Sequence, residues 1–341
     1  MLVLCTHAAG LGELVTDSLT ADLKGQISYS DDSAVMITTN ADAARVGRLS
    51  YVKNSFAVIG SVPRRQSLGQ SIGAITRELS RWTLDRSRRP FRLMFSEDGQ
   101  LVGVPGGSRT RLESAIGRAT GGRFQARGGG DEYWTIARRD LDEVLFCRRI
   151  PAPRRRQPAK GGLAPDVAEL IVNAAGRSRP GDVVLDPFAG TGALIRARTQ
   201  KPFREAICVD LGYRTGSVQL LPELARDKGV RRLAEDARTL PSLPDDSVDL
   251  VLTDPPWGEF EQDPAAAAAL IADALFSIGR VLRPGGRLAM LVARRLAGDV
   301  TRQWRRNDLR IGRSYDLLIN GHPATLLVGT LDKTAVLDGT G

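Results

Sequence analysis

The sequence predicts an α/β protein, and the two segments that predict it lie in the C-terminal half of the 341-residue chain. The first is the apolar run Val248–Thr253, which is followed directly by an acid, two prolines and an aromatic residue at 254–257. Because two prolines cannot continue a buried strand, the acid and the ring are held at its carboxyl end. The second, residues 182–195, has the order strand, glycine turn and helix start. Ligands of open α/β sheets bind at the edge where the carboxyl ends of the strands lie.

Residues 254–257 suit methylation of an exocyclic amine on a nucleobase, whose nitrogen lone pair is delocalised into the ring and is a poor nucleophile. The carboxylate of Asp254 and the carbonyl of Pro255 can accept the two amine hydrogens, while Trp257 stacks on the base. Together with Pro256, Pro255 holds both acceptors in place. A simple strand-ending turn is the alternative, since Asp-Pro is ordinary turn chemistry.

The glycine turn presents backbone N–H groups and a helix start to a ligand at the strand's end. A dinucleotide-binding fingerprint requires a third glycine at position 195, where Ile195 stands, and this disfavours a nicotinamide oxidoreductase. Asp186, just before the turn, suits a ligand with a positive end, such as the aminopropyl part of S-adenosylmethionine. A glycine-rich turn without a ligand is the alternative.

Two further acids fall where successive strands would end. Asp210 closes the short apolar run 206–209, the position from which a carboxylate accepts both ribose hydroxyls of a nucleoside. Asp236 follows a third strand and can accept from an adenine amino group. Any single acid here is more often a loop residue or helix cap, so the order of all four elements is the specific signal.

Residues 160–332 therefore resemble a class I S-adenosylmethionine-dependent methyltransferase. The resemblance implies a Rossmann-like fold, with a mostly parallel seven-stranded sheet that ends in an antiparallel hairpin. It also implies that residues 254–257 position the target amine, and that residues 160–165 precede the first helix and close over the cofactor. An interdomain linker is the alternative for 160–165. The implied cofactor-binding residues are Pro165, Asp186, Pro187, Phe188, Ala189, Gly190, Thr191, Gly192, Asp210, Leu211, Asp236 and Ala237.

Coarse periodicity supports this sheet. Asp263 is the expected N-cap of a helix over 265–282, which should stop at 283–286 before a fifth strand at 287–293. Two runs around Asn320-Gly321 predict the terminal hairpin.

The first 150 residues predict an α+β region of short strands and helices. Their order resembles the ferredoxin-like module ahead of a THUMP domain in tRNA methyltransferases, followed by THUMP itself. Such modules grip the acceptor stem end of tRNA by shape and charge. We therefore divide the chain into a ferredoxin-like module (1–62), a THUMP-like RNA-binding domain (63–150), a basic linker (151–160) and a methyltransferase domain (161–335).

The formal net charge of +9 favours a polyanionic partner. In the linker, Arg154, Arg155, Arg156 and Lys160 stand among prolines without an acid, and phosphate contact is the natural use of such a segment. A second arginine cluster lies within residues 64–92. A solvated surface is the alternative for both.

These observations and the resemblance lead us to expect an RNA methyltransferase that uses S-adenosylmethionine on guanine N2 in tRNA. Trp257 departs from the tyrosine or phenylalanine common in the guanine enzymes, and tryptophan there also occurs in adenine-N6 methyltransferases. Guanine N2 of ribosomal RNA is another alternative. A catalytically silent RNA-binding protein is a non-enzymatic one, although it would have little reason to keep Asp186, Asp210 and Asp254.

Three widely spaced cysteines form no metal-ligand pair with either histidine, so we expect no metal. No segment approaches the ~20 apolar residues that span a bilayer, and no signal peptide is evident. We expect a cytoplasmic protein without a membrane partner.

Overall fold

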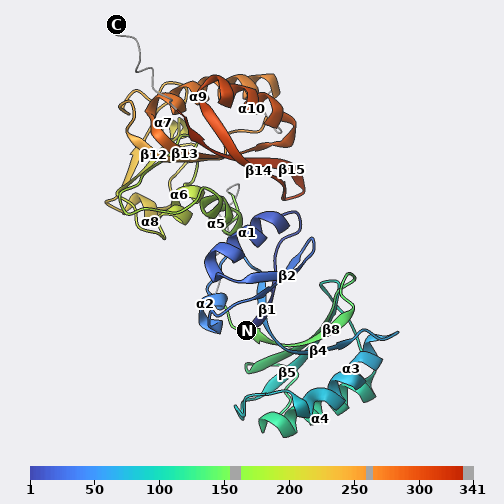
Figure 1. Ribbon diagram of the computed structural model, residues 1–341. Helices are drawn as coiled ribbons and strands as arrows, with labels where there is room; N and C mark the ends of the chain where they lie inside the picture. Colours follow the sequence, from blue (N-terminus) through green and yellow to red (C-terminus); the bar gives the residue numbers. More distant parts are fainter. Residues whose placement is uncertain (154–162, 259–263, 333–341) are drawn as a thin grey trace. The chain divides into compact units, whose positions relative to one another are not determined.

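The computed structural model describes residues 1–153, 163–258 and 264–332. The chain forms two compact units, Met1–Arg154 and Arg155–Gly341 (Figure 1). The predictions for Arg154, Arg155, Arg156, Lys160 and Asp263 fall outside the described residues.

A single eight-stranded sheet runs through the N-terminal unit, with the strand order β2-β3-β1-β4-β8-β7-β5-β6. The strands are β1 (Leu2–Thr6), β2 (Gln26–Ser30), β3 (Ala34–Thr38), β4 (Asn54–Pro63), β5 (Phe91–Glu97), β6 (Gln100–Leu101), β7 (Asp131–Ala137) and β8 (Glu143–Ile150). The helices are α1 (Gly12–Leu23), α2 (Ala43–Gly47), α3 (Leu68–Glu78), the 3-10 turn η1 (Leu79–Arg81) and α4 (Gly106–Thr120). Strands β4 and β8 pair from Ser55 to Pro63, so the sheet is continuous across the boundary expected at residue 62.

The two faces of this sheet have different cover. Helices α3 and α4 pack on one face through Ile72, Leu112 and Ile116. The apolar side chains of the other face form a separate cluster that includes Phe56 and Ile136. On this second face, the apolar side chains of the strands bury one another without cover from α3 or α4.

The sequence did not predict β2 or α4. Strand β2 alternates exposed and partly buried residues and has no apolar run. Helix α4 begins with two glycines, has a third at Gly117, and buries only Leu112, Ala115, Ile116 and Thr120. Glycines normally interrupt helical patterns, so α4 depends on tertiary packing against α3.

The C-terminal unit contains the predicted mostly parallel seven-stranded sheet, in the order β11-β10-β9-β12-β13-β15-β14. Its strands are β9 (Val183–Asp186), β10 (Glu205–Val209), β11 (Val230–Leu233), β12 (Val248–Thr253), β13 (Leu282–Ala293), β14 (Leu309–Ile319) and β15 (His322–Leu331). Strand β15 is antiparallel to both of its neighbours, which confirms the hairpin at Asn320-Gly321. The helices are α5 (Pro165–Ala174), α6 (Ala193–Arg198), α7 (Gly212–Thr215), α8 (Pro222–Ala225), α9 (Pro264–Val281), the 3-10 turn η2 (Arg294–Leu296) and α10 (Ala297–Arg306).

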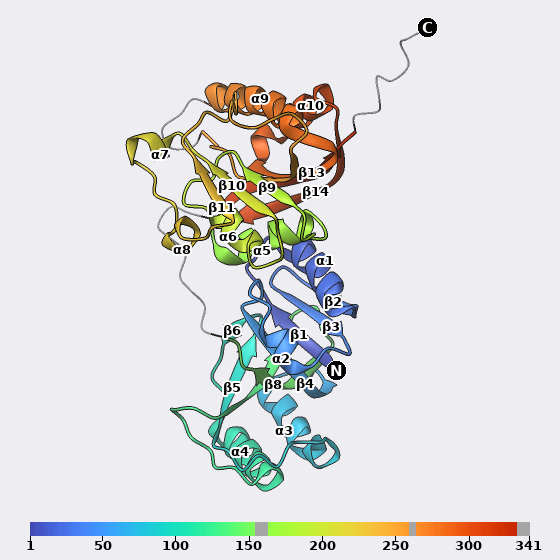
Figure 2. The same ribbon diagram turned by 90° about the vertical axis from the view of Figure 1, so that its left-hand side faces the viewer.

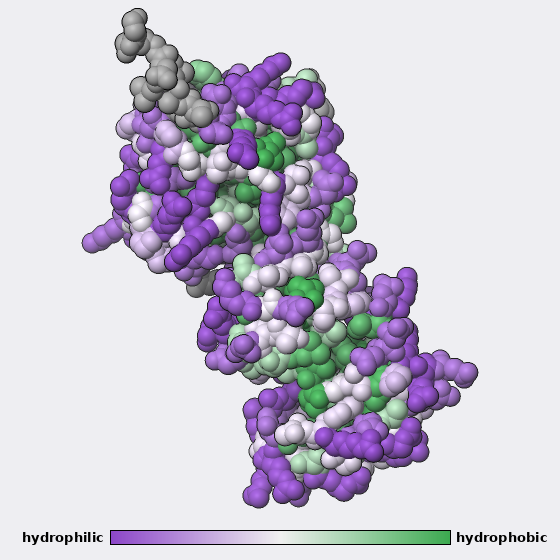
Figure 3. Space-filling model, viewed as in Figure 1, coloured by the Kyte–Doolittle hydropathy of each residue, from purple (hydrophilic) through white to green (hydrophobic). Residues whose placement is uncertain are grey.

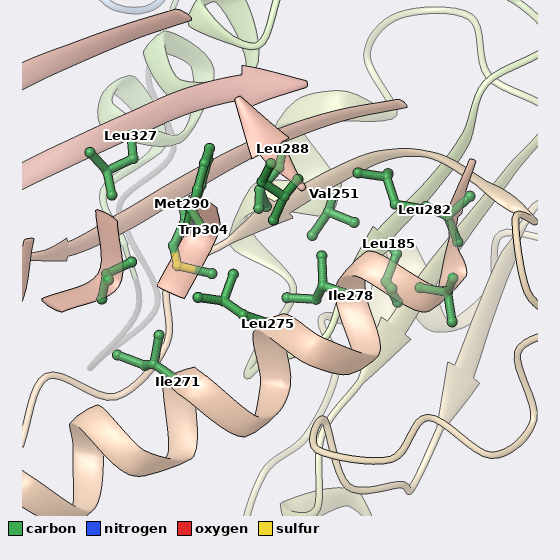
Figure 4. Close-up of a cluster of buried hydrophobic side chains, with 14 of the residues drawn as sticks. Leu185, Val251, Ile271, Leu275, Ile278, Leu282, Leu288, Met290, Trp304 and Leu327 are labelled. Carbon is green, nitrogen blue, oxygen red and sulfur yellow. The ribbon is translucent and has the colours of Figure 1, made fainter. Parts of the chain in front are cut away.

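Helices cover both faces of this second sheet, α9 and α10 on one side and α5 and α6 on the other (Figures 1 and 2). The apolar face of α9, with Ile271, Leu275 and Ile278, packs against strands β12 and β13 and against Trp304 of α10 (Figure 4). This explains why every residue of β12 is buried. No helix in the described ranges is long and apolar enough to cross a bilayer.

Asp182 precedes β9 at its amino end and holds a buried ion-pair network. Its Oδ2 accepts from Arg198 Nη2 and from Arg287 Nη2, each at 2.9 Å, and Arg198 has no exposed side-chain surface. Burial alone would raise the pKa of Asp182, but the Arg179 N–H and the guanidinium groups lower it overall. This network lies at the end of the sheet opposite the predicted site.

Candidate active site

The four predicted acids lie along one edge of the sheet. Asp186 ends β9, and Asp210, Asp236 and Asp254 follow β10, β11 and β12. These four strands are parallel neighbours in the order β11-β10-β9-β12. Their carboxyl ends therefore meet at the same edge, where ligands of such sheets bind.

The glycine turn between β9 and α6 uses its two glycines differently. Gly192 has φ of +90°, and a Cβ there would lie 2.6 Å from Leu224 Cδ1 and 2.7 Å from Leu220 Cδ1, so it allows close packing. Gly190 has φ of +51°, and a Cβ there would meet no atom of the described chain within 4 Å. The backbone at Gly190 is thus open to the approach of a ligand.

Asp210 ties this turn to the next one. Its Oδ2 accepts the Gly190 N–H at 2.9 Å and its Oδ1 accepts the Gly212 N–H at 2.7 Å. A carboxylate has about four acceptor positions, so both oxygens retain capacity for hydroxyl donors.

Tyr213 contacts the glycine turn of the candidate site, and the sequence analysis missed it. Its buried hydroxyl donates to the Gly190 carbonyl at 2.7 Å. Arg232 lies over its ring, 5.5 Å from the centroid. The position close after Asp210 is the only sequence signal that could have drawn attention to it.

Asp186 is a buried carboxylate without a cationic side-chain partner among the described residues. It is 2% exposed, and its Oδ1 accepts the Phe188 N–H at 3.1 Å. Burial and, to a smaller extent, the nearby Asp254 and Asp210 carboxylates raise its pKa to about 8, against the lowering effect of the Phe188 N–H. A cationic group bound at this edge would stabilise the ionised form.

Asp254 and Trp257 are joined by a hydrogen bond that the sequence analysis did not anticipate. Trp257 Nε1 donates to Asp254 Oδ1 at 2.9 Å, and the Trp257 carbonyl accepts from Arg295 Nη2 at 2.6 Å. Asp254 keeps some solvent exposure, yet desolvation by the surrounding protein raises its pKa to about 7, against the lowering effect of the indole N–H. The indole is thus fixed by its edge, with part of its surface packed against the core.

The remaining predicted site residues differ in their burial and in their contacts near this edge. The carboxylate of Asp236 forms an ion pair with Arg238 at 2.6 Å, which lowers its pKa. Ala237 is buried and Leu211 is 47% exposed. In the proline pair, Pro255 is buried and Pro256 exposed. The other predicted positions belong to the turn before α6, where Pro187, Ala189 and Gly192 are buried and Phe188 and Thr191 partly buried, or to the first residue of α5, Pro165.

Comparison with known proteins bears on the fold of the chain. Residues 224–312 match the model of a family described as "RMKL-like, methyltransferase domain". The crystal structure of TrmN from Thermus thermophilus superposes on 97% of this chain and 99% of its own, with a TM-score of 0.70 at 23% identity. The C-terminal unit has the class I methyltransferase fold. SMU.472, determined as a complex with SAH, superposes on 96% of the chain with a TM-score of 0.64 at 12% identity.

Two curated relatives align with part of this methyltransferase-like chain. A tRNA (guanine(6)-N2)-methyltransferase from Thermus thermophilus is 35% identical over 159 residues, which cover 45% of each protein. A tRNA (guanine(10)-N2)-dimethyltransferase from Methanothermobacter thermautotrophicus is 30% identical over 144 residues, 38% of this chain and 41% of that protein. The aligned segments thus span less than half the length of each relative.

Proposed function

We propose that this protein is an S-adenosylmethionine-dependent RNA methyltransferase that acts on guanine N2 in tRNA. The observation that carries the proposal is that two carboxylates of raised pKa, Asp186 and Asp254, lie at the same edge of the sheet. The indole of Trp257 donates a hydrogen bond to the second of them. Asp186 suits a cationic cofactor, and Asp254 suits the N–H groups of a target amine. The partial similarity to two tRNA guanine-N2 enzymes supports the choice of substrate.

The residues present fit the cofactor. S-adenosylmethionine supplies a methyl group activated by a sulfonium, and its amino acid end carries an ammonium next to a carboxylate. Asp186, buried without a cationic partner in the described part of the chain, would face the positive end. Gly190 leaves room for close approach, and Asp210 has acceptor capacity for the ribose hydroxyls. We propose contacts to the adenine from Asp236 and Ala237.

Asp210→Ala is expected to weaken S-adenosylmethionine binding by roughly ten- to a hundredfold, because a hydrogen bond to a charged group is worth about 1.5–3 kcal/mol. Isothermal titration calorimetry of the full-length protein measures this affinity. Asp227→Ala is the control, since that exposed carboxylate only accepts the Gly229 N–H in a turn. Equal affinities of wild type and Asp210→Ala would remove Asp210 from the cofactor site.

Asp254 and the Pro255 carbonyl would accept the two hydrogens of the target amine. The Asp254 carboxylate already accepts one hydrogen bond from Trp257, and this fixes its orientation before any substrate binds. A preorganised acceptor favours a more pyramidal nitrogen, whose lone pair is available for methyl transfer. Trp257 would also present its ring to the base.

RNA affinity is assigned to the N-terminal unit and to Arg154, Arg155, Arg156 and Lys160, with the acceptor stem region of tRNA as the bound part. Replacing the three arginines by alanine is expected to lower RNA affinity and to make its salt dependence shallower, because fewer counterions are released. Binding titrations at several salt concentrations measure both quantities. Cofactor affinity should stay at the wild-type value. An unchanged dependence of RNA affinity on salt would mean that the three arginines make no phosphate contacts and that the segment only connects the two units.

Nucleoside mass spectrometry tests the proposed function. Transfer RNA and ribosomal RNA from cells with and without this protein are digested, and N2-methylguanosine should be lost from the tRNA fraction alone. Loss of N6-methyladenosine would instead assign the adenine amine, which the tryptophan at position 257 favours as the second candidate. A methyl group that disappears from ribose or from a ring carbon would contradict the exocyclic-amine chemistry.

A further inference from the structure

A second candidate site lies in the N-terminal unit. A hollow of about 350 Å³ opens on the sheet face that α3 and α4 do not cover, and strands β1, β4 and β7 contribute to its lining. Figure 3 shows hydrophobic side chains gathered across this part of the unit. The lining includes Phe56, Trp134 and Ile136, with the exposed cation of Lys53 at the rim. None of these residues belongs to the proposed methyl-transfer site.

His7 gives this hollow a buried hydrogen-bond acceptor. The side chain is 2% exposed, and its Nδ1 lies 2.9 Å from the Ala8 carbonyl. A carbonyl can only accept, so Nδ1 carries the hydrogen and Nε2 carries a lone pair. Burial lowers the pKa of His7, which keeps the ring neutral. Within the described chain Nε2 has no hydrogen-bond partner, so a ligand that donates an N–H or O–H would satisfy it.

Two aromatic residues in edge-to-face contact also line this hollow. The rings of Phe56 and Trp134 lie 5.1 Å apart at 61°. Trp134 Nε1 donates to Glu132 Oε2 at 3.2 Å, so the indole is held by its edge and only partly buried. A partly exposed indole suits a planar ring, because base–aromatic stacking requires only a π-face.

The charges around the rim leave Lys53 as the cation available to a ligand. Arg138 also lines the hollow, but its Nε and Nη2 donate to the Asp31 carboxylate at 2.6 and 2.7 Å. Asp98 accepts the Arg139 N–H at 2.6 Å and lies 3.7 Å from the Arg139 guanidinium. Lys53 raises the positive potential near His7, and we find no ion pair for it among the described residues.

We propose that this hollow binds one unstacked nucleotide of the RNA. Its base would stack on Trp134, whose indole packs against Phe56, an N–H on the edge of the base would donate to His7 Nε2, and its phosphate would lie near Lys53. The proposal rests on the proposed function in so far as RNA is the source of the nucleotide. The hollow would be a second RNA-recognition element, which binds an unpaired nucleotide by stacking and by hydrogen bonds to the edge of its base.

A matched pair of variants in the full-length protein tests the acceptor. His7→Met keeps a neutral side chain of similar length without the nitrogen acceptor, and His7→Gln places a carbonyl oxygen near the position of Nε2. The probes are AMP, CMP, GMP and UMP, with binding followed by ligand-observed NMR. At least one should bind, His7→Met should weaken it by roughly tenfold or more, and His7→Gln should restore binding toward wild type.

A change on the ligand keeps the test decisive if a variant fails to fold. The base of UMP has a single N–H donor, at N3, and the base of AMP has only its amino group. N3-methyl-UMP and N6,N6-dimethyl-AMP remove these donors but keep the ring and the phosphate, and N4,N4-dimethyl-CMP and N1,N2,N2-trimethyl-GMP do the same for the other two bases. The methylated form of whichever nucleotide binds should lose affinity on wild-type protein. Equal binding of parent and methylated forms, or no binding by any of the four nucleotides, would overturn the proposal.

Methyl transfer separates this proposal from the proposed function. If nucleotide binding depends on His7 but no RNA is methylated, the site stands and the enzymatic proposal fails. If RNA is methylated and His7→Met leaves its KM and kcat unchanged, the nucleotide site fails and the enzymatic proposal stands. The expected result is a raised KM for RNA at unchanged kcat, with unchanged S-adenosylmethionine affinity.

Discussion

Asp254→Ala is expected to lower the single-turnover rate of methyl transfer by ~100-fold or more, the usual cost of removing one preorganised electrostatic contact. Asp254→Asn should keep a measurable rate, because its carbonyl oxygen still accepts a hydrogen bond. Even with its pKa raised to about 7, Asp254 is far too weak a base to deprotonate a neutral aromatic amine. We therefore expect it to orient the amine, and the proton to leave after transfer, when the nitrogen is cationic.

The pH profile checks the same role of Asp254. The free carboxyl is protonated below its raised pKa, so kcat/KM of the wild type should fall as the pH drops through about 7. Asp254→Asn should lack this acid limb. In the wild type, the Trp257 Nε1 donor lowers the pKa of Asp254. Trp257→Phe keeps an aromatic ring but removes this donor, so the acid limb of its pH profile should move to higher pH. Equal losses in the Asn and Ala variants would show instead that the negative charge itself is required.

Asp182→Ala is expected to reduce the free energy of unfolding of the C-terminal unit by ~3–5 kcal/mol, the usual cost of breaking a buried ion pair from one side. The substitution leaves the fully buried Arg198 guanidinium and the largely buried Arg287 without their shared carboxylate. Urea denaturation followed by circular dichroism and tryptophan fluorescence measures the change. Because this acid lies at the amino end of β9, the effect should appear without a cofactor.

Asp245→Ala is the matched control for this stability prediction. Asp245 pairs with Arg280 at 2.6 Å, but its side chain is 71% exposed. Exposed pairs contribute about 0–1 kcal/mol, so this variant should unfold close to wild type. Similar midpoints for the two alanine variants would mean that the buried network adds little to stability.

The sequence by itself determined the parts of this protein that depend on neighbouring residues. Apolar runs and the residues that interrupt them predicted β12 at its observed bounds, the acids at the ends of successive strands, and the hairpin at Asn320-Gly321. These signals are local, because strand burial, turns and prolines act on a few consecutive residues. The order of the strands along the chain then sufficed to place Asp186, Asp210 and Asp254 at one edge of a parallel sheet.

Only the tertiary structure decided the partners and the burial of individual groups. It engages Asp236 with Arg238, joins Trp257 to Asp254, and places Tyr213 on the Gly190 carbonyl. It also raises the pKa of Asp186 through burial. The N-terminal unit shows the same limit, since His7, which follows β1, and Trp134 in β7 line one hollow from positions far apart in the chain. Packing between distant segments sets the Tyr213 contact, the burial of Asp186 and the lining of the hollow. The two local pairs, Asp236–Arg238 and Asp254–Trp257, depend on side-chain conformations that the sequence pattern does not encode.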